Sequence, residues 1–436
     1  MKTTSKLFPD AAFKKNFLFL SFIMTVFLIA RIINGNFRLL DSDDYFYTAE
    51  LLKSFHYFSP TANLIEGIEL TKRPFLYPLL LLFPGFLNEF LIVFLQTILG
   101  LFNLYLVLKI FKSLGGKSYK WITFLLFLTP SIFINTHLIM TETVTSTLIL
   151  GLFVLFSNKL NAKKILYIQI LISCLVFLKP AFYLFTIINI LFFLAYFIKT
   201  KIFQFSIFIP LLLTLAYIGF NQQRTDYAHF SSIQNINLID YNLYLFKMNQ
   251  EGAEEANLWK ESVYKNAEKY KNFKETSDYL EEVGKSEIKK NLIPYGFFHL
   301  KCALRGMFDP GRFDLMTFYK EEQHASDGFM QLLNKKDFGA VLKFLLDSKY
   351  KIVLLLLIPI FLANIFKWLF TFSYLWKNKH CLNFRNGYLI LLFSYSILIS
   401  GPVNSCRYMV ILQGIIIVIS ILGWENFRQK KSSTIK

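Results

Sequence analysis

The chain has 436 residues, of which 54% are hydrophobic, 18% are aromatic and only 17% are charged. Soluble domains contain about 25% charged residues, and the apolar residues here occur in runs long enough to span a bilayer. The composition therefore excludes a water-soluble globular protein and predicts an all-α polytopic membrane protein. The net charge of +18 by itself would also suit a nucleic-acid-binding protein, so the position of the charges decides between the two.

The excess positive charge lies outside one long stretch of the chain. Between Asn221 and Lys349 there are 18 Lys and Arg against 19 Asp and Glu, which is an ordinary soluble composition. Elsewhere, short basic clusters separate the apolar runs, as the positive-inside rule predicts for cytoplasmic loops. We therefore expect membrane lipid as a partner and no nucleic acid.

We expect about ten transmembrane helices, because ten apolar runs approach or reach the length of a bilayer span. They cover 16–34, 88–108, 121–139, 143–157, 164–178, 181–198, 203–219, 350–370, 386–400 and 407–424. Basic clusters fall on alternate loops, within 2–15, 109–120, 159–164, 199–201, 377–385 and 428–431. This pattern predicts a multi-pass protein of the cell (inner) membrane with both termini in the cytoplasm.

Three regions follow from this topology. They are an N-terminal transmembrane module (1–219) with a first outer loop at 35–87, an outer soluble domain (220–349), and a C-terminal transmembrane module with a cytoplasmic tail (350–436). The outer domain is expected to be mainly helical over Glu251–Tyr270 and Tyr279–Lys290, and to be interrupted at Pro294, Pro310 and Gly311. Phe75–Leu87 is too short to span and is expected at the outer interface.

An acidic cluster follows the first span directly, at Asp41, Asp43 and Asp44. Three carboxylates here suit a solvated loop, and Asp41 or Ser42 also suits the N-cap of a helix. A third interpretation is a functional site, because the same outer loop ends with Lys72 and Arg73.

A second acidic position is Glu142, the one acidic residue between Phe90 and Phe220. It suits an interfacial carboxylate that contacts headgroup water. It also suits a site, because Lys179 and Arg407 are predicted at the same outer level and ionisable groups at membrane depth are costly unless they are paired.

A carboxylate beside cations suits a reaction in which a hydroxyl group displaces a phosphate from an activated carbon. The carboxylate accepts the proton of the hydroxyl, and neighbouring cations keep it ionised near neutral pH. The cations also offset the charge that develops on the departing phosphate.

Five short motifs, all on the predicted outer side, resemble the GT-C superfamily of integral-membrane glycosyltransferases that use polyprenyl-phosphate sugars. This superfamily includes protein O-mannosyltransferases and lipid A aminoarabinose transferases. The motifs are Asp41 with Tyr45, Ala49 and Leu52 at helical spacing, Arg73-Pro74-Phe75-Leu76-Tyr77, Thr141-Glu142, Lys179-Pro180 and Arg407-Tyr408. Phe75 stands where the family pattern has a proline.

The resemblance implies a GT-C-like fold and an inverting glycosyltransferase that moves a sugar from a polyprenyl-phosphate donor to a glycan, lipid or protein on the outer face. Asp41 would be the general base, with Asp44 and Asp43 as alternates, and Glu142 would be the second acidic residue. Substrate-binding residues would be Tyr45, Lys72, Arg73, Tyr77, Lys179 and Arg407. The three aspartates could also bind a divalent cation, but the relatives mostly require none, so no cofactor is expected.

Two other functions remain open. A polysaccharide polymerase or ligase would be expected to concentrate arginines in the outer loop near its last spans, and the 220–349 stretch has only Arg224, Arg305 and Arg312. A lipid-linked glycan flippase or transporter would usually show inverted repeats and charged segments near mid-membrane, whereas the unusual charges here lie at the outer edge.

Overall fold

The computed structural model describes residues 8–61, 64–83, 88–156, 160–201, 203–318, 339, 340, 343, 351–378, 384–403 and 406–434. Within these ranges the regular secondary structure is entirely helical, which agrees with the expected all-α class. Parts of the predicted loops, including 84–87 and most of 319–350, lie outside the described residues.

The first half of the chain, from the first predicted span to the start of the 220–349 stretch, contains the following helices. They are α1 (Ala11–Asn34), α2 (Leu40–Lys53), η1 (His56–Phe58), α3 (Leu64–Lys72), α4 (Leu76–Leu82), α5 (Glu89–Ser113), α6 (Tyr119–Phe127), α7 (Pro130–Thr136), α8 (Glu142–Phe156), α9 (Ala162–Leu178), η2 (Pro180–Phe182), α10 (Phe185–Thr200), η3 (Phe205–Phe208) and α11 (Ile209–Thr225).

The second half begins with polar helices and ends with apolar ones. The elements are α12 (Ile233–Ile236), the π-helix η4 (Asn237–Leu243), α13 (Tyr244–Glu251), α14 (Ala253–Ala267), α15 (Phe273–Lys290), α16 (Leu292–Gly306), α17 (Arg312–Phe318), α20 (Lys351–Lys377), α21 (Phe384–Ser400), η6 (Gly401–Val403) and α22 (Cys406–Thr434).

Seven helical segments of the described chain are long and apolar enough to cross a membrane, which supports a multi-pass membrane protein. They are Ala11–Asn34, Glu89–Ser113, Pro180–Thr200, Phe205–Thr225, Leu355–Lys377, Asn386–Val403 and Cys406–Gln429. Each overlaps one of the ten expected spans. The expected spans 143–157 and 164–178 form α8 and α9, which have 15 and 17 residues.

The expected span at 121–139 is not one continuous helix. Helix α6 ends at Phe127 and α7 begins at Pro130, with Thr129 between them at φ −126° and ψ 66°. Proline has no backbone N–H and disfavours a helical conformation in the residue before it, so the sequence Thr129-Pro130 breaks the helix. The apolar composition alone did not reveal this break.

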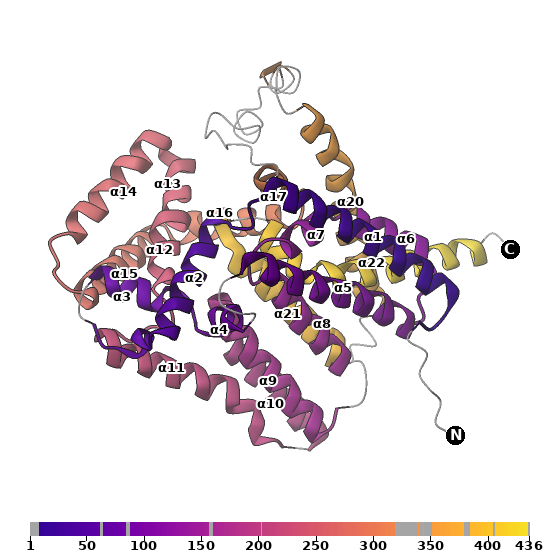
Figure 1. Ribbon diagram of the computed structural model, residues 1–436, viewed down its shortest axis with the longest axis horizontal. Helices are drawn as coiled ribbons and strands as arrows, with labels where there is room; N and C mark the ends of the chain where they lie inside the picture. The colour runs from indigo at the N-terminus through magenta and orange to yellow at the C-terminus, as the bar shows by residue number, and fades with distance from the viewer. Residues whose placement is uncertain are drawn as a thin grey trace.

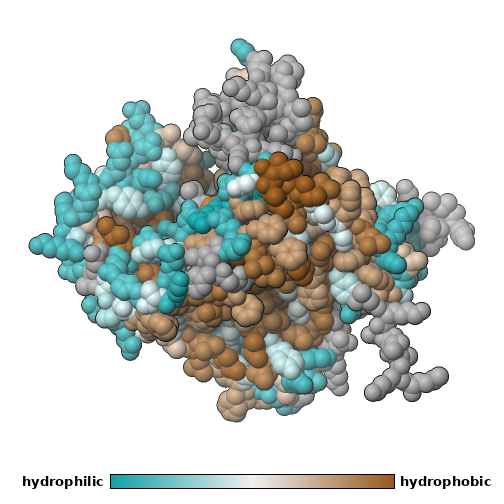
Figure 2. Space-filling view, viewed as in Figure 1, coloured by the Kyte–Doolittle hydropathy of each residue, from teal (hydrophilic) through white to brown (hydrophobic). Residues whose placement is uncertain are grey.

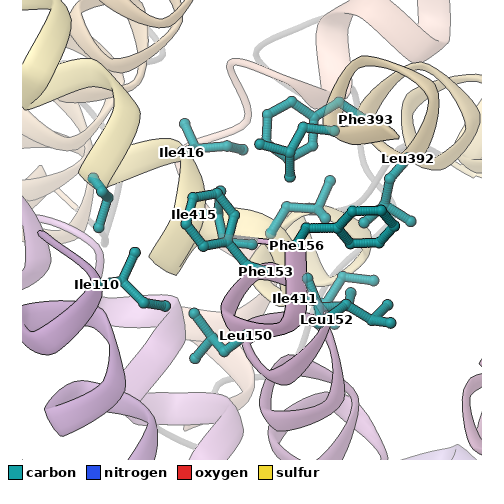
Figure 3. Packing of buried hydrophobic residues seen from close by; sticks show 14 of the residues in the cluster. Ile110, Leu150, Leu152, Phe153, Phe156, Leu392, Phe393, Ile411, Ile415 and Ile416 are labelled. Atoms are coloured by element: carbon teal, nitrogen blue, oxygen red, sulfur yellow. The ribbon is translucent and has the colours of Figure 1, made fainter. Parts of the chain in front are cut away.

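The largest hydrophobic core lies between helices that are distant in sequence. Figure 3 shows part of it, where side chains of α5, α8, α21 and α22 meet, among them Ile110, Phe153, Phe393 and Ile415. Helix α22 is the most enclosed candidate span, with 89% of its apolar window buried inside the protein. Helix α22 therefore lies at the centre of the bundle.

The polar helices gather at one end of the molecule. In Figure 1, α13, α14 and α15 lie at the left, whereas α1 begins and α22 ends at the right. Figure 2 shows hydrophilic residues over the left end and a hydrophobic surface over the bundle beside it. Ile239, Leu243 and Val263 form a small separate core among the polar helices. Pro310 and Gly311 separate α16 from α17, as expected.

The helical region is interrupted near Pro294, as expected, because α15 ends at Lys290 and α16 begins just before this proline. Pro294 is the third residue of α16, which runs from Leu292 to Gly306. The first turn of a helix tolerates proline, because the N–H groups there have no partner within the helix.

Candidate functional site

Helix α2 carries Asp41 and Asp44 in its first turns, and Asp41 contacts the start of α22. Its N-cap is Leu39, so the expectation that Asp41 or Ser42 is the N-cap is wrong. Instead, Ser42 Oγ accepts the Leu39 N–H at 2.8 Å and donates to the Ile139 carbonyl oxygen at 2.9 Å. Ser42 is fully buried, so this residue fixes the first turn of α2 against the chain before α8.

The segment after α3 brings two cations to these carboxylates. Arg73 Nη2 lies 2.8 Å from Asp41 Oδ1 and 2.8 Å from Asp44 Oδ2. Lys72 Nζ lies 2.8 Å from Asp44 Oδ1. The 35–87 segment therefore folds back so that Lys72 and Arg73 pair with Asp41 and Asp44.

Two helix ends complete the arrangement from the other side. Arg407, in the first turn of α22, donates through Nη2 to Asp41 Oδ2, and its Nε lies 3.0 Å from Glu142 Oε1. Lys179, at the end of α9, lies 3.0 Å from the same Glu142 oxygen. Arg407 thus links the two acidic positions of the sequence.

We call these seven residues the ion-pair cluster: Asp41, Asp44, Lys72, Arg73, Glu142, Lys179 and Arg407. Asp41 has the most exposed side chain of the set at 27%, whereas the Glu142 side chain is 1% exposed. Asp41 is therefore the acidic residue of the cluster with the most solvent contact, and Glu142 is the most enclosed.

The electrostatic setting keeps Asp41 ionised. Burial acts to raise the pKa of the Asp41 carboxyl group, but the charges of Arg73 and Arg407 outweigh burial and hold this pKa well below its usual range. Burial acts to lower the pKa of Arg73, but the nearby Tyr45, Asp41 and Asp44 outweigh burial and raise this pKa. The carboxylate and the guanidinium groups are charged at physiological pH.

Tyr45 and Tyr77, the two tyrosines predicted to bind substrate, lie on the buried side of the cluster. The Arg73 guanidinium lies over the Tyr45 ring at 5.0 Å from its centroid, and the Tyr77 ring packs edge-on against Tyr45 at 4.8 Å. The Tyr77 hydroxyl donates to Gln96 Oε1 at 2.6 Å. Both tyrosines are at most 3% exposed, so they form the buried surface on which the Arg73 guanidinium packs.

Asp43 points away from the cluster. Its carboxylate is 64% exposed and pairs with Arg38 at 2.9 Å. Within the described ranges, no three Asp, Glu, His or Cys side chains are grouped so as to hold a metal ion. Asp43 therefore serves as a natural control for Asp41.

Sequence reasoning missed the residues that hold the Lys72–Arg73 segment. Ser231 Oγ donates to the Lys72 carbonyl oxygen at 2.7 Å, and His229 Nε2 lies 2.9 Å from Thr71 Oγ1. Burial lowers the pKa of His229 to about 4, so this ring is neutral at physiological pH. These residues follow α11 in sequence, and no local pattern connects them with the first loop.

Sequence reasoning also missed the support of α22. Asp309 Oδ2 accepts the Cys406 N–H at 2.7 Å, next to Arg407. Asp314 Oδ2 accepts from Asn135 Nδ2 at 2.7 Å and from the Cys406 thiol at 3.1 Å. Burial raises the pKa of Asp314 to about 6. The Asp309-Pro310-Gly311 turn was a usable signal, because Asp before Pro and Gly favours a turn that fixes its own carboxylate.

Comparisons with models of protein families, with curated proteins and with solved structures gave no match to the chain. The function is therefore inferred from the residues, their geometry and the resemblance of the five motifs.

Proposed function

We propose that the protein is an inverting glycosyltransferase of the cell membrane that transfers a sugar from a polyprenyl-phosphate donor to a glycan, lipid or protein acceptor. The observation that supports it best is the accessible carboxylate of Asp41, bound on one oxygen by Arg73 and on the other by Arg407. An ionised base flanked by two fixed guanidinium groups suits displacement of a phosphate by a hydroxyl group.

The charge of the cluster supports a phosphate ligand. Its four cations and three carboxylates leave one positive charge in excess when all seven groups are ionised. A sugar-phosphate diester has one negative charge, and arginine binds phosphate through paired hydrogen bonds. When phosphate binds Arg73 and Arg407, it shares the hydrogen bonds that these residues give to Asp41, and a carboxylate oxygen becomes available to the acceptor.

The proposed reaction is a single displacement. The acceptor oxygen forms a bond to the anomeric carbon of the sugar, and the bond from that carbon to the phosphate oxygen breaks, with both electrons leaving on the phosphate. Asp41 takes the acceptor proton as general base. Arg73 and Arg407 stabilise the charge that grows on the leaving polyprenyl phosphate. One displacement inverts the configuration at the carbon.

Glu142 and Lys179 have a supporting role in this proposal. The Glu142 side chain is buried, and its carboxylate pairs with Arg407 and Lys179 beside Asp41. Lys179 also lies over the Tyr408 ring, 5.0 Å from its centroid. The basic clusters on alternate loops support a cytoplasmic location for both termini and an outer location for the site.

Mass spectrometry of cell-envelope glycans tests the proposal in a strain that lacks the protein. Expression of the unsubstituted protein or of Asp43→Asn in this strain should restore the missing sugar, whereas expression of Asp41→Asn should not. Full restoration by Asp41→Asn would exclude Asp41 as the base. An unchanged glycan in the deletion strain, together with an altered transbilayer distribution of lipid-linked precursors, would indicate a flippase instead.

A further inference from the structure

Helix α16 has an exposed apolar stripe although it belongs to the 220–349 stretch, which the sequence assigns to a soluble outer domain. Ile293, Phe297, Leu300 and Leu304 are 70%, 73%, 43% and 45% exposed. Their spacing of four, three and four residues puts them on one face of the helix, over a length of about 16 Å. Scattered apolar residues are common on protein surfaces, but a continuous helical stripe requires a partner.

The opposite face of α16 is packed on the membrane-spanning bundle. His299 Nε2 lies 2.8 Å from the Leu398 carbonyl oxygen near the end of α21, and Cys302 and Ala303 are buried. Gly401 of η6 lies against the His299 ring, where a Cβ on residue 401 would be 2.4 Å from Cε1. Helix α16 is therefore fixed at the end of the Asn386–Val403 span, where a bilayer surface must lie if that segment crosses a membrane.

The charges around the stripe suit lipid headgroups. No acidic residue occurs between Ile288 and Phe308. Lys289, Lys290 and Lys301 are exposed, and lysine side chains extend along apolar surfaces to reach phosphate groups at a membrane interface. In Figure 1, α16 lies between the polar helices α13–α15 and the bundle that contains α22.

We propose that α16 is an interfacial membrane helix, whose stripe enters the outer leaflet while its lysines bind anionic lipid headgroups. The inference rests on the membrane-spanning bundle and not on the reaction. It also connects the bilayer to the ion-pair cluster, because the chain leaves α16 and reaches Asp309, which binds the Cys406 N–H beside Arg407. Part of the 220–349 stretch, namely α16, is then bound to the membrane.

Electron paramagnetic resonance tests this placement on the full chain in vesicles of phosphatidylethanolamine and phosphatidylglycerol. A nitroxide is attached in Phe297→Cys, and in Ile293→Cys and Leu300→Cys as further points on the stripe, with the unsubstituted chain as the background. Glu282→Cys, at an exposed polar position of α15, is the matched control. The ratio of collisions with oxygen to collisions with a water-soluble nickel chelate should be several-fold higher on the stripe than at the control.

Two results would overturn the proposal. Stripe positions as accessible to the nickel chelate as the control would show that the helix lies in water. Stripe positions shielded from both reagents would show that a protein surface covers them. The headgroup contact is tested by omitting phosphatidylglycerol, which should move the labels to a shallower depth, and an unchanged depth would contradict it.

Discussion

Arg407 and Asp41 form a direct ion pair although 366 residues separate them in the chain. The pair joins the first turn of α22 to the first turn of α2, and Arg73 binds the other oxygen of the same carboxylate. The two ends of the membrane domain therefore meet at one acidic residue. The proposed reaction predicts different effects for substitutions around Asp41: on donor binding, on the pH dependence of activity and on the stability of the protein.

Arg73→Gln should weaken donor binding about ten- to a hundredfold, because a hydrogen bond to a charged group contributes about 1.5–3 kcal/mol. Arg73→Lys keeps the charge and should lose less. The measurement is the KM for the lipid-linked donor, and thermal unfolding should be recorded for each variant. Arg38→Gln is the matched control, because Arg38 is 40% exposed and pairs with Asp43 and Glu89. An equal increase in KM for both glutamine variants would contradict the assignment.

Arg407→Gln should move the acidic limb of the activity profile to higher pH. The pKa of Asp41 lies below its ordinary value of 3.8, so in the folded protein its carboxylate keeps its charge below about pH 4. The stability that its ion pairs contribute is lost only as the pH falls from about 4 toward that lowered pKa. Without Arg407, one of the charges that lower the pKa of Asp41 is lost, while burial still acts to raise this pKa. Asp41 should therefore be protonated at a higher pH. The position of the limb in kcat/KM against pH is the measurement. A limb that stays in place would show that Arg407 does not control Asp41.

Glu142→Gln should lower the stability of the protein by about 3–5 kcal/mol, because it leaves the buried Lys179 without its carboxylate partner. The double variant Glu142→Gln with Lys179→Met should recover part of this loss, since no unpaired lysine then remains. Thermal unfolding in one detergent compares the two. A double variant that is less stable than Glu142→Gln would indicate that Lys179 has another essential role.

Gly401→Ala should destabilise the protein by about 1–3 kcal/mol, because residue 401 has φ +43° and its new Cβ would lie 2.4 Å from the His299 ring. That ring cannot move without losing its hydrogen bond to the Leu398 carbonyl oxygen. Gly219→Ala is the control, since a Cβ there meets nothing within 4 Å, and it should be neutral or slightly stabilising. Unfolding temperatures that are equal for the two variants would show that α16 is not fixed at this point.

The sequence predicted the seven long apolar helices and most of the cluster for the same physical reason. Charged residues are rare in an apolar chain, so Glu142, Lys179 and Arg407 are conspicuous at the ends of their runs. The break at Thr129-Pro130 was missed because apolar composition is the same in one long helix and in two short ones. Proline alone did not decide the question, since Pro359 lies inside the continuous helix α20.

The supporting contacts could not be predicted, because they join segments with no common local pattern. Ser231 meets the Lys72 carbonyl oxygen across 159 residues, and Asp314 meets Asn135 across 179. Such contacts depend on how the helices pack. The stripe of α16 was visible in the sequence as apolar periodicity, but whether it faces the core or the outside is decided by its contact with α21.

The most direct test of the account measures release of polyprenyl phosphate by the purified protein in nanodiscs, supplied with labelled lipid-linked sugars and acceptor from the membranes in which it is made. We predict steady release by the unsubstituted chain and by Asp43→Asn, and a rate about a hundredfold to ten-thousandfold lower for folded Asp41→Asn, as expected for loss of a general base. Release by Asp41→Asn at the unsubstituted rate would contradict the account.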